Sequence, residues 1–255
     1  MKISVVTVCF NSERTIGDAI RSFLSQTHTD KELLVIDGKS ADRTLAIIGE
    51  FSSSDVRVVS EKDRGIYDAM NKGLRLFAGD AVGFLNSDDT FHDDRALERI
   101  AVGLTEAEAV HGGIEMVTDH STKRSVRTWK GEPFERGSFR RGWMPPHPTF
   151  YIRRSLVEKT GEFDLRYPIA ADYDFMLRAM ELHATHAQYI PGALVDFVVG
   201  GKSSGSLSKV LRGNIQSLRS RREHLGTPFI DPAFFMKPLR KVLQQHWRRT
   251  SARNF

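Results

Sequence analysis

The sequence has 255 residues, of which 40% are hydrophobic and 27% charged, so it can bury a substantial core as one large domain or as one domain with a small appendage. Its longest apolar runs, such as residues 3–10 and 33–36, fall far short of the roughly 20 residues that cross a bilayer, which excludes a membrane-spanning helix. The net charge of +5 and an isoelectric point near 9.4 indicate an anionic partner.

The N-terminal residues and the cysteine content indicate the compartment. Residues 1–15 carry one Lys and a short apolar run but no cleavage site of a signal peptide, so we interpret them as part of a strand. Cys9 is the one cysteine of the sequence, which excludes an internal disulfide and a cysteine-based metal cluster. Both observations favour a cytoplasmic protein.

The first half of the sequence alternates short apolar runs with helical patterns. Residues 2–10 are typical of a buried strand, and residues 14–26 of a helix with one apolar face. The same patterns then predict a strand at 33–37, a helix that Ser40 or Asp42 caps and that runs to residue 51, a strand at 56–60, a helix at 66–77 and a strand at 81–85. This alternation predicts a parallel, doubly wound α/β sheet.

Polar side chains follow each of these four strands, at residues 7–11, 37–40, 61–63 and 86–89. Ligands bind outside the carboxyl ends of the strands in open α/β sheets, so the sequence predicts the site there, although a single Asp at a strand end is usually a helix cap. Several carboxylates at one edge repel one another unless a cation or hydrogen-bond donors compensate. Oxygen ligands suit Mg²⁺ or Mn²⁺, which complete their coordination with phosphates and water, so a nucleoside diphosphate fits.

Three other nucleotide-binding motifs are absent. A nicotinamide-binding fold requires a glycine-rich turn after its first strand, whereas this chain has "CFNSERT" and no glycine before Gly17. The P-loop pattern is also missing. A sugar nucleotidyltransferase would carry a Gly- and Arg-rich loop near the N-terminus, and none is present.

Three stretches of the sequence resemble family 2 glycosyltransferases, which have the GT-A fold. They are "ISVVTVCFNSERTIGDAIRSFLSQTHTDKELLVIDGKSADRT", "SEKDRGIYDAMNKGLRLFAGDAVGFLNSDD" and "HPTFYIRRSLVEKTGEFDLRYPIAADYDFMLR", which occur in the family's order over roughly residues 2–200. Within the family, the sequence looks like the bacterial enzymes that build cell-surface polysaccharides. The resemblance implies a mostly parallel central sheet flanked by helices. It places a glycosyltransferase domain at 1–205, with a nucleotide-sugar half (1–110) and an acceptor half (111–205), before a basic helical extension at 206–255.

The resemblance assigns "NSDD" at 86–89 to the family's DxD motif. Asn86 stands where an Asp is usual, Ser87 is the spacer, and Asp88 is the carboxylate that holds Mn²⁺ or Mg²⁺ against the diphosphate of a nucleotide sugar. A Lewis acid suits the reaction because glycosyl transfer expels a nucleoside diphosphate. Asn86 removes one charge and puts the metal affinity in doubt, but its amide can still bond the ribose or a metal-bound water.

The remaining donor-site residues also come from the resemblance. Thr7 and Asn11 line the nucleotide pocket, and Asp37 contacts the base. Further candidates are Gly38, whose backbone passes close to the base, and Asp63, another donor-site residue. Arg64 and Lys72 are predicted to face the diphosphate, as is Lys202 in the Gly/Ser-rich loop 199–206. For the three cations the alternatives are surface charge and, for Lys202, a plain connecting loop.

The acceptor half supplies the predicted base. By the resemblance Asp172, in "IAADYDFMLR", stands at the family's catalytic base, in a motif usually written Glu-Asp; here Ala171 replaces the Glu. Asp174 is the second candidate, and capping of a helix start is the alternative for both carboxylates. A single base implies a single displacement with inversion at C1. His147 and Trp143, in the Pro-rich loop 142–151, are predicted to line the acceptor or diphosphate site, with a structural role as the alternative for His147.

The sequence thus predicts an inverting, metal-dependent glycosyltransferase that moves a sugar from a nucleotide-sugar donor to a glycan or lipid-linked acceptor, with no nucleic acid as partner. The alternative is a catalytically silent nucleotide- or glycan-binding protein, which Asn86 and Ala171 keep open. The tail has apolar residues at helical spacing between cations, at Leu239, Val242, Leu243, His246 and Trp247. Such a basic amphipathic helix lies on an anionic membrane surface or docks on the catalytic domain.

Overall fold

The structure is a computed structural model that describes residues 1–51, 53–184, 186–199 and 207–228. The predicted alternation is present in the first half, with β1 (Ile3–Cys9), α1 (Ile16–Leu24), β2 (Lys31–Asp37), α2 (Thr44–Gly49), β3 (Val56–Ser60), α3 (Ile66–Leu76) and β4 (Ala81–Phe84). The helix α2 begins later than predicted. Residues 40–43 form a loop instead, in which Asp42 accepts the backbone N–H of Thr44 at 3.0 Å.

The second half extends the sheet beyond β4. Its elements are β5 (Asp89–Phe91), α4 (Ala96–Glu106), β6 (Ala109–Val117), β7 (Ser125–Trp129), the 3-10 turns η1 (Phe139–Arg141) and η2 (His147–Thr149), β8 (Tyr151–Arg153), α5 (Arg154–Thr160), α6 (Ala171–Leu177), the π-helical turn η3 (Arg178–His183), β9 (Ala187–Val198) and α7 (Leu207–Leu225). Among the described residues, no helix combines the length and apolar character that a membrane span requires.

One sheet runs through the molecule in the order β3-β2-β1-β4-β8-β6-β9-β5, with β7 paired to β6. The neighbours from β3 to β4 are parallel, as are β6 and β9, whereas β8 runs antiparallel between β4 and β6. The register pairs Cys9 with Asp37, and Asp37 with Ser60, so the carboxyl ends of β1, β2 and β3 lie level. The polar residues that follow these strands therefore meet at one edge, as predicted.

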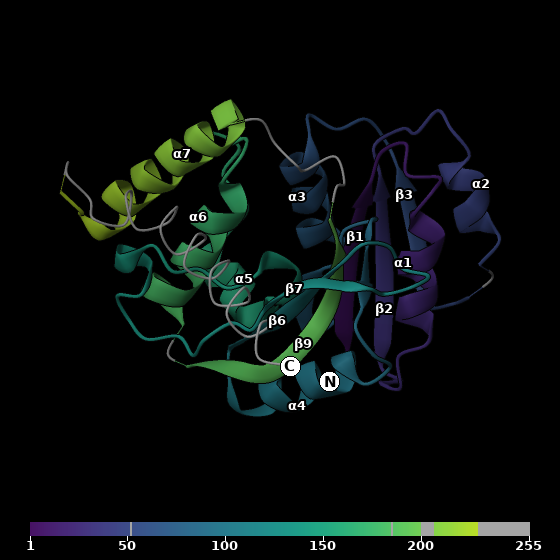
Figure 1. Ribbon diagram of the computed structural model, residues 1–255, viewed down its shortest axis with the longest axis horizontal. Helices are drawn as coiled ribbons and strands as arrows, with labels where there is room; N and C mark the ends of the chain where they lie inside the picture. Colours follow the sequence, from purple (N-terminus) through teal and green to yellow (C-terminus); the bar gives the residue numbers. More distant parts are fainter. Residues whose placement is uncertain (52, 185, 200–206, 229–255) are drawn as a thin grey trace, which may run out of the picture.

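Helices cover both faces of the sheet (Figure 1). Alternate residues of β1 point to opposite faces, so Val6 and Val8 pack with α3, α5 and α6, while Ile3 and Val5 pack with α1, α2 and α4. Burial on both faces explains why the parallel strands are continuously apolar. The helix α7 lies along α6, outside the layer that contains α3 (Figure 1).

Candidate active site

Asp37 lies at the centre of the strand-end edge. Its carboxylate is fully buried and accepts hydrogen bonds from the hydroxyls of Ser60, at 2.6 Å, and Ser40, at 2.5 Å. The thiol of Cys9 also donates to it at 3.7 Å. Burial and the nearby charge of Asp37 raise the pKa of the Cys9 thiol, so Cys9 stays protonated. The site therefore holds Asp37 as an oriented acceptor beside an inert thiol.

Asn11 ties the loop after β1 to the loop after β2. Its φ of 50° is in the left-handed region, which asparagine adopts more readily than most residues. The side chain Oδ1 accepts the N–H of Ala41 at 2.9 Å, and the backbone N–H donates to the hydroxyl of Ser40 at 2.9 Å. Thr7 is buried nearby on β1, and its hydroxyl has no partner within the described part of the chain.

Gly38 and Asp63 are in contact. Neither the spacing nor the periodicity of the sequence indicates this contact. A Cβ on Gly38 would lie 2.4 Å from Oδ2 of Asp63 and 3.4 Å from the ring of Phe10. Asp63 is fixed from its other side, where Oδ1 accepts the N–H of Gly65 at 2.9 Å. A glycine is therefore required at position 38 for this carboxylate to approach the backbone.

The "NSDD" turn joins the carboxyl end of β4 to β5. Asn86 donates through Nδ2 to Oδ2 of Asp89 at 2.7 Å, and Ser87 lies 3.0 Å from the hydroxyl of Ser12. Asp89 is buried, and burial, reinforced by the charge of Asp88, raises its pKa well above the ordinary value. Asp88 is the more exposed of the two carboxylates. An amide suits position 86 because it donates to Asp89, whereas an ionised carboxylate at that position would repel it.

His120 supports this turn from the loop between β6 and β7. One ring nitrogen, Nε2, lies 3.0 Å from the carbonyl oxygen of Asp88, and Nδ1 lies 3.3 Å from the hydroxyl of Thr90. The backbone of Asp88 is thus held by a residue 32 positions away. No pattern in the sequence singled out His120.

The residues of this turn fit a divalent cation. Among the described residues, no three His, Cys, Asp or Glu side chains converge on one point. Mg²⁺ and Mn²⁺ need only one or two carboxylates when a diphosphate and water supply the other ligands. Asp88 supplies an accessible carboxylate, and Oδ1 of buried Asp89 has no hydrogen-bond partner among the described residues.

Asp172 is the second residue of α6 and is partly exposed. The hydroxyl of Tyr67, on α3, lies 3.1 Å from Oδ1 of Asp172 and 3.1 Å from the carbonyl oxygen of Ile169. Burial, followed by the charge of Asp172, raises the pKa of Tyr67, so its hydroxyl remains a donor. Tyr67 therefore orients the predicted base, although no pattern in the sequence singles it out.

Asp174 has a different environment. It is fully buried and accepts hydrogen bonds from Arg178 at 2.8 Å, Ser220 at 2.8 Å and His224 at 3.0 Å. Burial alone would raise the pKa of Asp174, but the hydrogen bond from His224 and the charge of Arg178 lower it overall. No side chain caps the start of α6, so Asp174 joins α6 to α7 instead of capping.

His147 lies between the base and the end of β4. Its ring stacks on Phe84 with centroids 5.4 Å apart, and Nε2 is buried without a partner in the described residues. Burial lowers the pKa of His147, and the nearby charge of Asp172 opposes that shift. Because Phe84 lies two residues before Asn86, His147 lies near Asp172 and beside the strand that leads into the "NSDD" turn.

Three other predicted residues have partners of their own within the chain. Trp143 is only 8% exposed and packs against Phe139, with centroids 5.4 Å apart, so its ring is not available to stack on a sugar. Arg64 is largely exposed and pairs with Asp68 at 3.0 Å, which agrees with the surface-charge alternative. The side chain of Lys72 is largely buried and pairs with Glu61 at 3.0 Å, so it is not a solvated surface charge. Lys202 lies outside the described residues, as do residues 235–248 of the tail.

This geometry corresponds to a known family. The model of glycosyl transferase family 2 matches residues 4–161, more than half of the chain. The chain belongs to glycosyl transferase family 2. It is therefore a glycosyltransferase, and the resemblance seen in the three motifs is confirmed.

Named relatives of this glycosyltransferase are bacterial. A PGL/p-HBAD biosynthesis glycosyltransferase of Mycobacterium tuberculosis is 29% identical over 212 residues, which cover 81% of this chain and 80% of the relative. An uncharacterized glycosyltransferase of the same species is 32% identical over 182 residues, covering 69% and 68%. The UDP-Glc:alpha-D-GlcNAc-diphosphoundecaprenol beta-1,3-glucosyltransferase WfgD of Escherichia coli is 31% identical over 121 residues, covering 47% and 48%.

Solved structures share the fold. TarS of S. aureus (residues 1–349), solved with UDP, has a TM-score of 0.64 at 20% identity and covers 91% of this chain and 68% of its own. The mannosyltransferase PcManGT from Pyrobaculum calidifontis, solved with GDP-Man and Mn²⁺, has a TM-score of 0.66 at 16% identity and covers 92% and 68%. The predicted α/β GT-A fold is thus confirmed.

Proposed function

We propose that this glycosyltransferase moves a sugar with inversion from a nucleotide-sugar donor to an acceptor hydroxyl that Asp172 deprotonates. The observation that carries the proposal is the position of Asp172, which is accessible, oriented by Tyr67 and close to His147 beside the end of β4. Residues 1–110 would form the donor half and residues 111–205 the acceptor half, with residues 206–255 as a basic extension.

The proposed reaction is a single displacement. The acceptor oxygen attacks C1 of the donor sugar and its proton passes to Asp172, while the bond between C1 and the diphosphate oxygen breaks. A second carboxylate acting as nucleophile would give retention, and one base suffices for inversion. Tyr67 donates its hydrogen bond to Oδ1 of Asp172, which leaves Oδ2 to take the proton of the acceptor hydroxyl.

The nucleotide would lie along the strand-end edge. Asp37 is fully buried, so it would act on the base pocket through the hydroxyls of Ser40 and Ser60 that it orients. Thr7 and Asn11 would line this pocket, and Gly38 would allow Asp63 close to the same surface. The buried hydroxyl of Thr7 supports this proposal, since buried polar groups are normally paired.

We also propose that Asp88 holds Mn²⁺ or Mg²⁺ against the donor diphosphate. When bound, the cation would supply positive charge to the departing nucleoside diphosphate. The Mn²⁺ in the PcManGT structure supports the proposal by analogy of fold.

A glycan or a lipid-linked saccharide is the proposed acceptor, which would place the enzyme in the cytoplasm at the inner face of the plasma membrane. WfgD supports this choice, since its name specifies a diphospholipid-linked acceptor and 31% of aligned residues are identical. The charge of +5 suits work beside anionic lipid or substrate.

The test is a donor screen with the intact chain. UDP- and GDP-sugars are offered with Mn²⁺, Mg²⁺ or chelator, and the anomeric configuration of the product is read by NMR. We expect turnover that chelator abolishes and a product whose anomeric configuration is opposite to that of the donor. A retained configuration would contradict the single displacement, and full activity in chelator would contradict the metal.

A further inference from the structure

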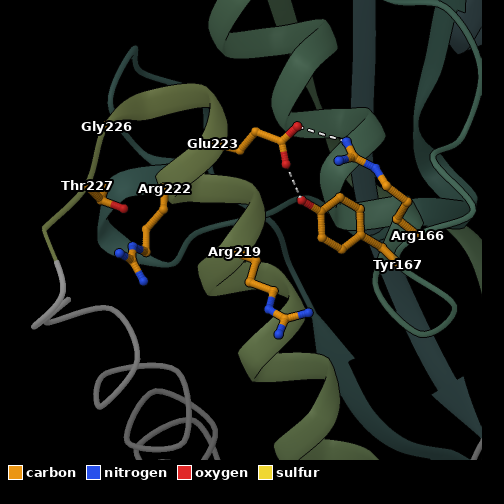
Figure 2. A pocket seen from close by; sticks show the side chains of 7 residues that line it. All are labelled: Arg166, Tyr167, Arg219, Arg222, Glu223, Gly226 and Thr227. Atoms are coloured by element: carbon orange, nitrogen blue, oxygen red, sulfur yellow. Dashed lines mark hydrogen bonds and ion pairs between the residues drawn. The ribbon is translucent and has the colours of Figure 1, made fainter.

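A basic cavity of about 590 Å³ lies apart from the strand-end edge, against the C-terminal half of α7. Figure 2 shows its lining side chains, with Arg166 and Tyr167 on one wall and Arg219 and Arg222 projecting from α7. Thr227 lies beyond the end of the helix at the rim. Three arginines thus line one cavity, and no step of the proposed reaction uses it.

The carboxylate of Glu223 lines this cavity and already has partners within the chain. The carboxylate of Glu223 accepts hydrogen bonds from Arg166, at 2.8 Å, and from the hydroxyl of Tyr167, at 2.8 Å (Figure 2). Arg166 is also paired with Asp164 at 2.6 Å. The wall formed by Arg166 is therefore compensated from within the chain and offers little charge to a ligand.

Arg219 has no such compensation. Its guanidinium makes no hydrogen bond or ion pair with any part of the chain that the structure describes. The hydroxyl of Thr227 is buried and likewise has no hydrogen-bond partner among the described residues. A guanidinium and a buried hydroxyl that both face one cavity are suited to an anion with several acceptor oxygens.

The helix that lines the cavity also contacts the segment before the proposed base. Gln216, on α7, accepts the N–H groups of Ile169 at 2.9 Å and Ala170 at 3.0 Å. Ala170 lies two residues before Asp172, and Arg219 lies three residues after Gln216, or about 4.5 Å further along the helix axis. The helix α7 therefore joins the wall of the cavity to the segment that leads into Asp172.

We propose that this cavity binds a phosphate or diphosphate group of the acceptor, while Asp172 faces the acceptor hydroxyl. The inference rests on the proposed role of Asp172 and adds the substrate class, an acceptor sugar that carries a phosphate ester or diphosphate. The guanidinium of Arg219 would bind phosphate oxygens through its fork of N–H groups, with Arg222 adding charge and Thr227 a hydroxyl. The phosphate is held there and no bond to it changes.

The binding test uses inorganic pyrophosphate, UDP and GDP as probes of the intact chain, measured by calorimetry. The cavity variant is Arg219→Gln with Arg222→Gln. The matched control is Lys209→Gln with Arg212→Gln, which removes the same charge from exposed positions of α7 outside the cavity. We expect the cavity variant alone to bind pyrophosphate at least about tenfold more weakly, with affinity for UDP or GDP unchanged in both. Equal pyrophosphate affinity in the wild type and the cavity variant would overturn the proposal.

A transfer assay then compares two acceptors that differ only in phosphate. One is a short-chain alkyl diphospho-sugar and the other is the neutral alkyl glycoside of the same sugar. We expect the cavity variant to raise the KM of the diphosphate acceptor by at least about tenfold at unchanged kcat and to leave the neutral acceptor unaffected. An equal loss with both acceptors would contradict phosphate recognition.

Vesicles of phosphatidylglycerol separate a bound acceptor from a lipid headgroup. If both variants lose vesicle binding equally while pyrophosphate binding is unchanged, the arginines serve a membrane surface and the proposal is wrong. Absence of transfer to either acceptor by the wild type, with pyrophosphate binding still lost only in the cavity variant, would contradict the proposed function and leave the anion site standing.

Discussion

Asp172 and Asp174 lie two residues apart on α6, yet their surroundings give them different tasks. Asp172 is partly exposed and has a neutral donor, Tyr67, at 3.1 Å. Asp174 is fully buried and paired with Arg178 and His224. A base must reach solvent or substrate, and a buried ion pair must stay intact, so the exposure of Asp172 suits the proposed base and the burial of Asp174 does not.

Asp172→Asn tests the base. The amide keeps the shape and the hydrogen bond from Tyr67 but cannot accept the proton, so we expect kcat to fall by about a hundredfold or more at unchanged donor affinity. Transfer kinetics and calorimetry with the nucleoside diphosphate measure the two quantities. A variant that transfers sugar at the normal rate would exclude Asp172 as base.

Asp174→Asn is the matched change for comparison. It leaves Arg178 without its buried counter-charge, so we expect it to lower the free energy of unfolding by about 3 kcal/mol. Urea denaturation of both variants separates the roles, because Asp172→Asn is expected to unfold at the wild-type midpoint. If transfer is lost in a fully stable Asp174→Asn enzyme, the base has been assigned to the wrong carboxylate.

Gly38→Ala tests the contact between β2 and Asp63. The new Cβ would lie 2.4 Å from Oδ2 of Asp63, so this side chain has to move from its place beside the proposed nucleotide. We expect donor affinity to fall by about tenfold, since overpacking costs about 1–3 kcal/mol. Gly49→Ala is the control, because no atom lies within 4 Å of its Cβ position. Equal donor affinities in the two variants would contradict the role of Gly38.

At the scale of elements, the pairing of β5 with β9 fixes the "NSDD" turn. Asp89 opposes Phe197 in this antiparallel pair, and the next residues of β9 and β5 bring Asp196 to His92. Asp196 is 1% exposed and also pairs with Lys123 at 2.9 Å. The turn that carries Asp88 is therefore anchored through β5 to a strand more than 100 residues later.

This anchor should depend on pH. The hydrogen bond to Asp196, aided by its charge and opposed by burial, raises the pKa of His92 above the ordinary 6.5. The folded state thus holds this proton more tightly than the unfolded state, so the pair stabilises the fold below about pH 6.5, and this contribution is lost as the pH rises through the raised pKa. We expect His92→Gln to be less stable than the wild type at about pH 6, with a smaller difference at about pH 9.

Chemical denaturation at the two pH values measures the effect. Val102→Ala is the control, because it shortens an exposed apolar side chain and removes no titratable group, so its cost is expected to be the same at both pH values. A His92→Gln deficit that does not change with pH would show that His92 contributes only packing.

At the scale of the molecule, the net charge of +5 bears on where the enzyme works. The amphipathic pattern in residues 235–248 predicts attraction to anionic lipid. We expect the intact chain to co-sediment with phosphatidylglycerol vesicles, less at high salt and not with neutral vesicles. A full-length variant with the tail cations changed to Gln should lose this binding, at Lys237, Arg240, Lys241 and Arg248. Binding that is equal in both proteins would place the membrane contact elsewhere or remove it.

Much of the site was predictable because chain order and local periodicity encode it. Alternating apolar runs predicted the first four strands, and the parallel arrangement required their polar ends to meet, which brought Asp37, Asp63 and Asp88 to one edge. The resemblance of short motifs added Asp172. The start of α2 was less predictable: Ser40 donates to buried Asp37 and caps no helix, whereas Asp42 accepts the N–H of Thr44, the first residue of α2.

Long-range packing decided the rest. Tyr67 meets Asp172 across 105 positions, and His120 meets Asp88 across 32 positions. Trp143 is of a residue type that stacks on sugar rings, but its aromatic neighbours bury it. The sequence by itself determined which residue types follow each strand, since that depends on neighbours along the chain. Only the tertiary structure decided which side chain orients the base, which carboxylate stays accessible and where α7 places its arginines, because each depends on segments that the sheet order brings together.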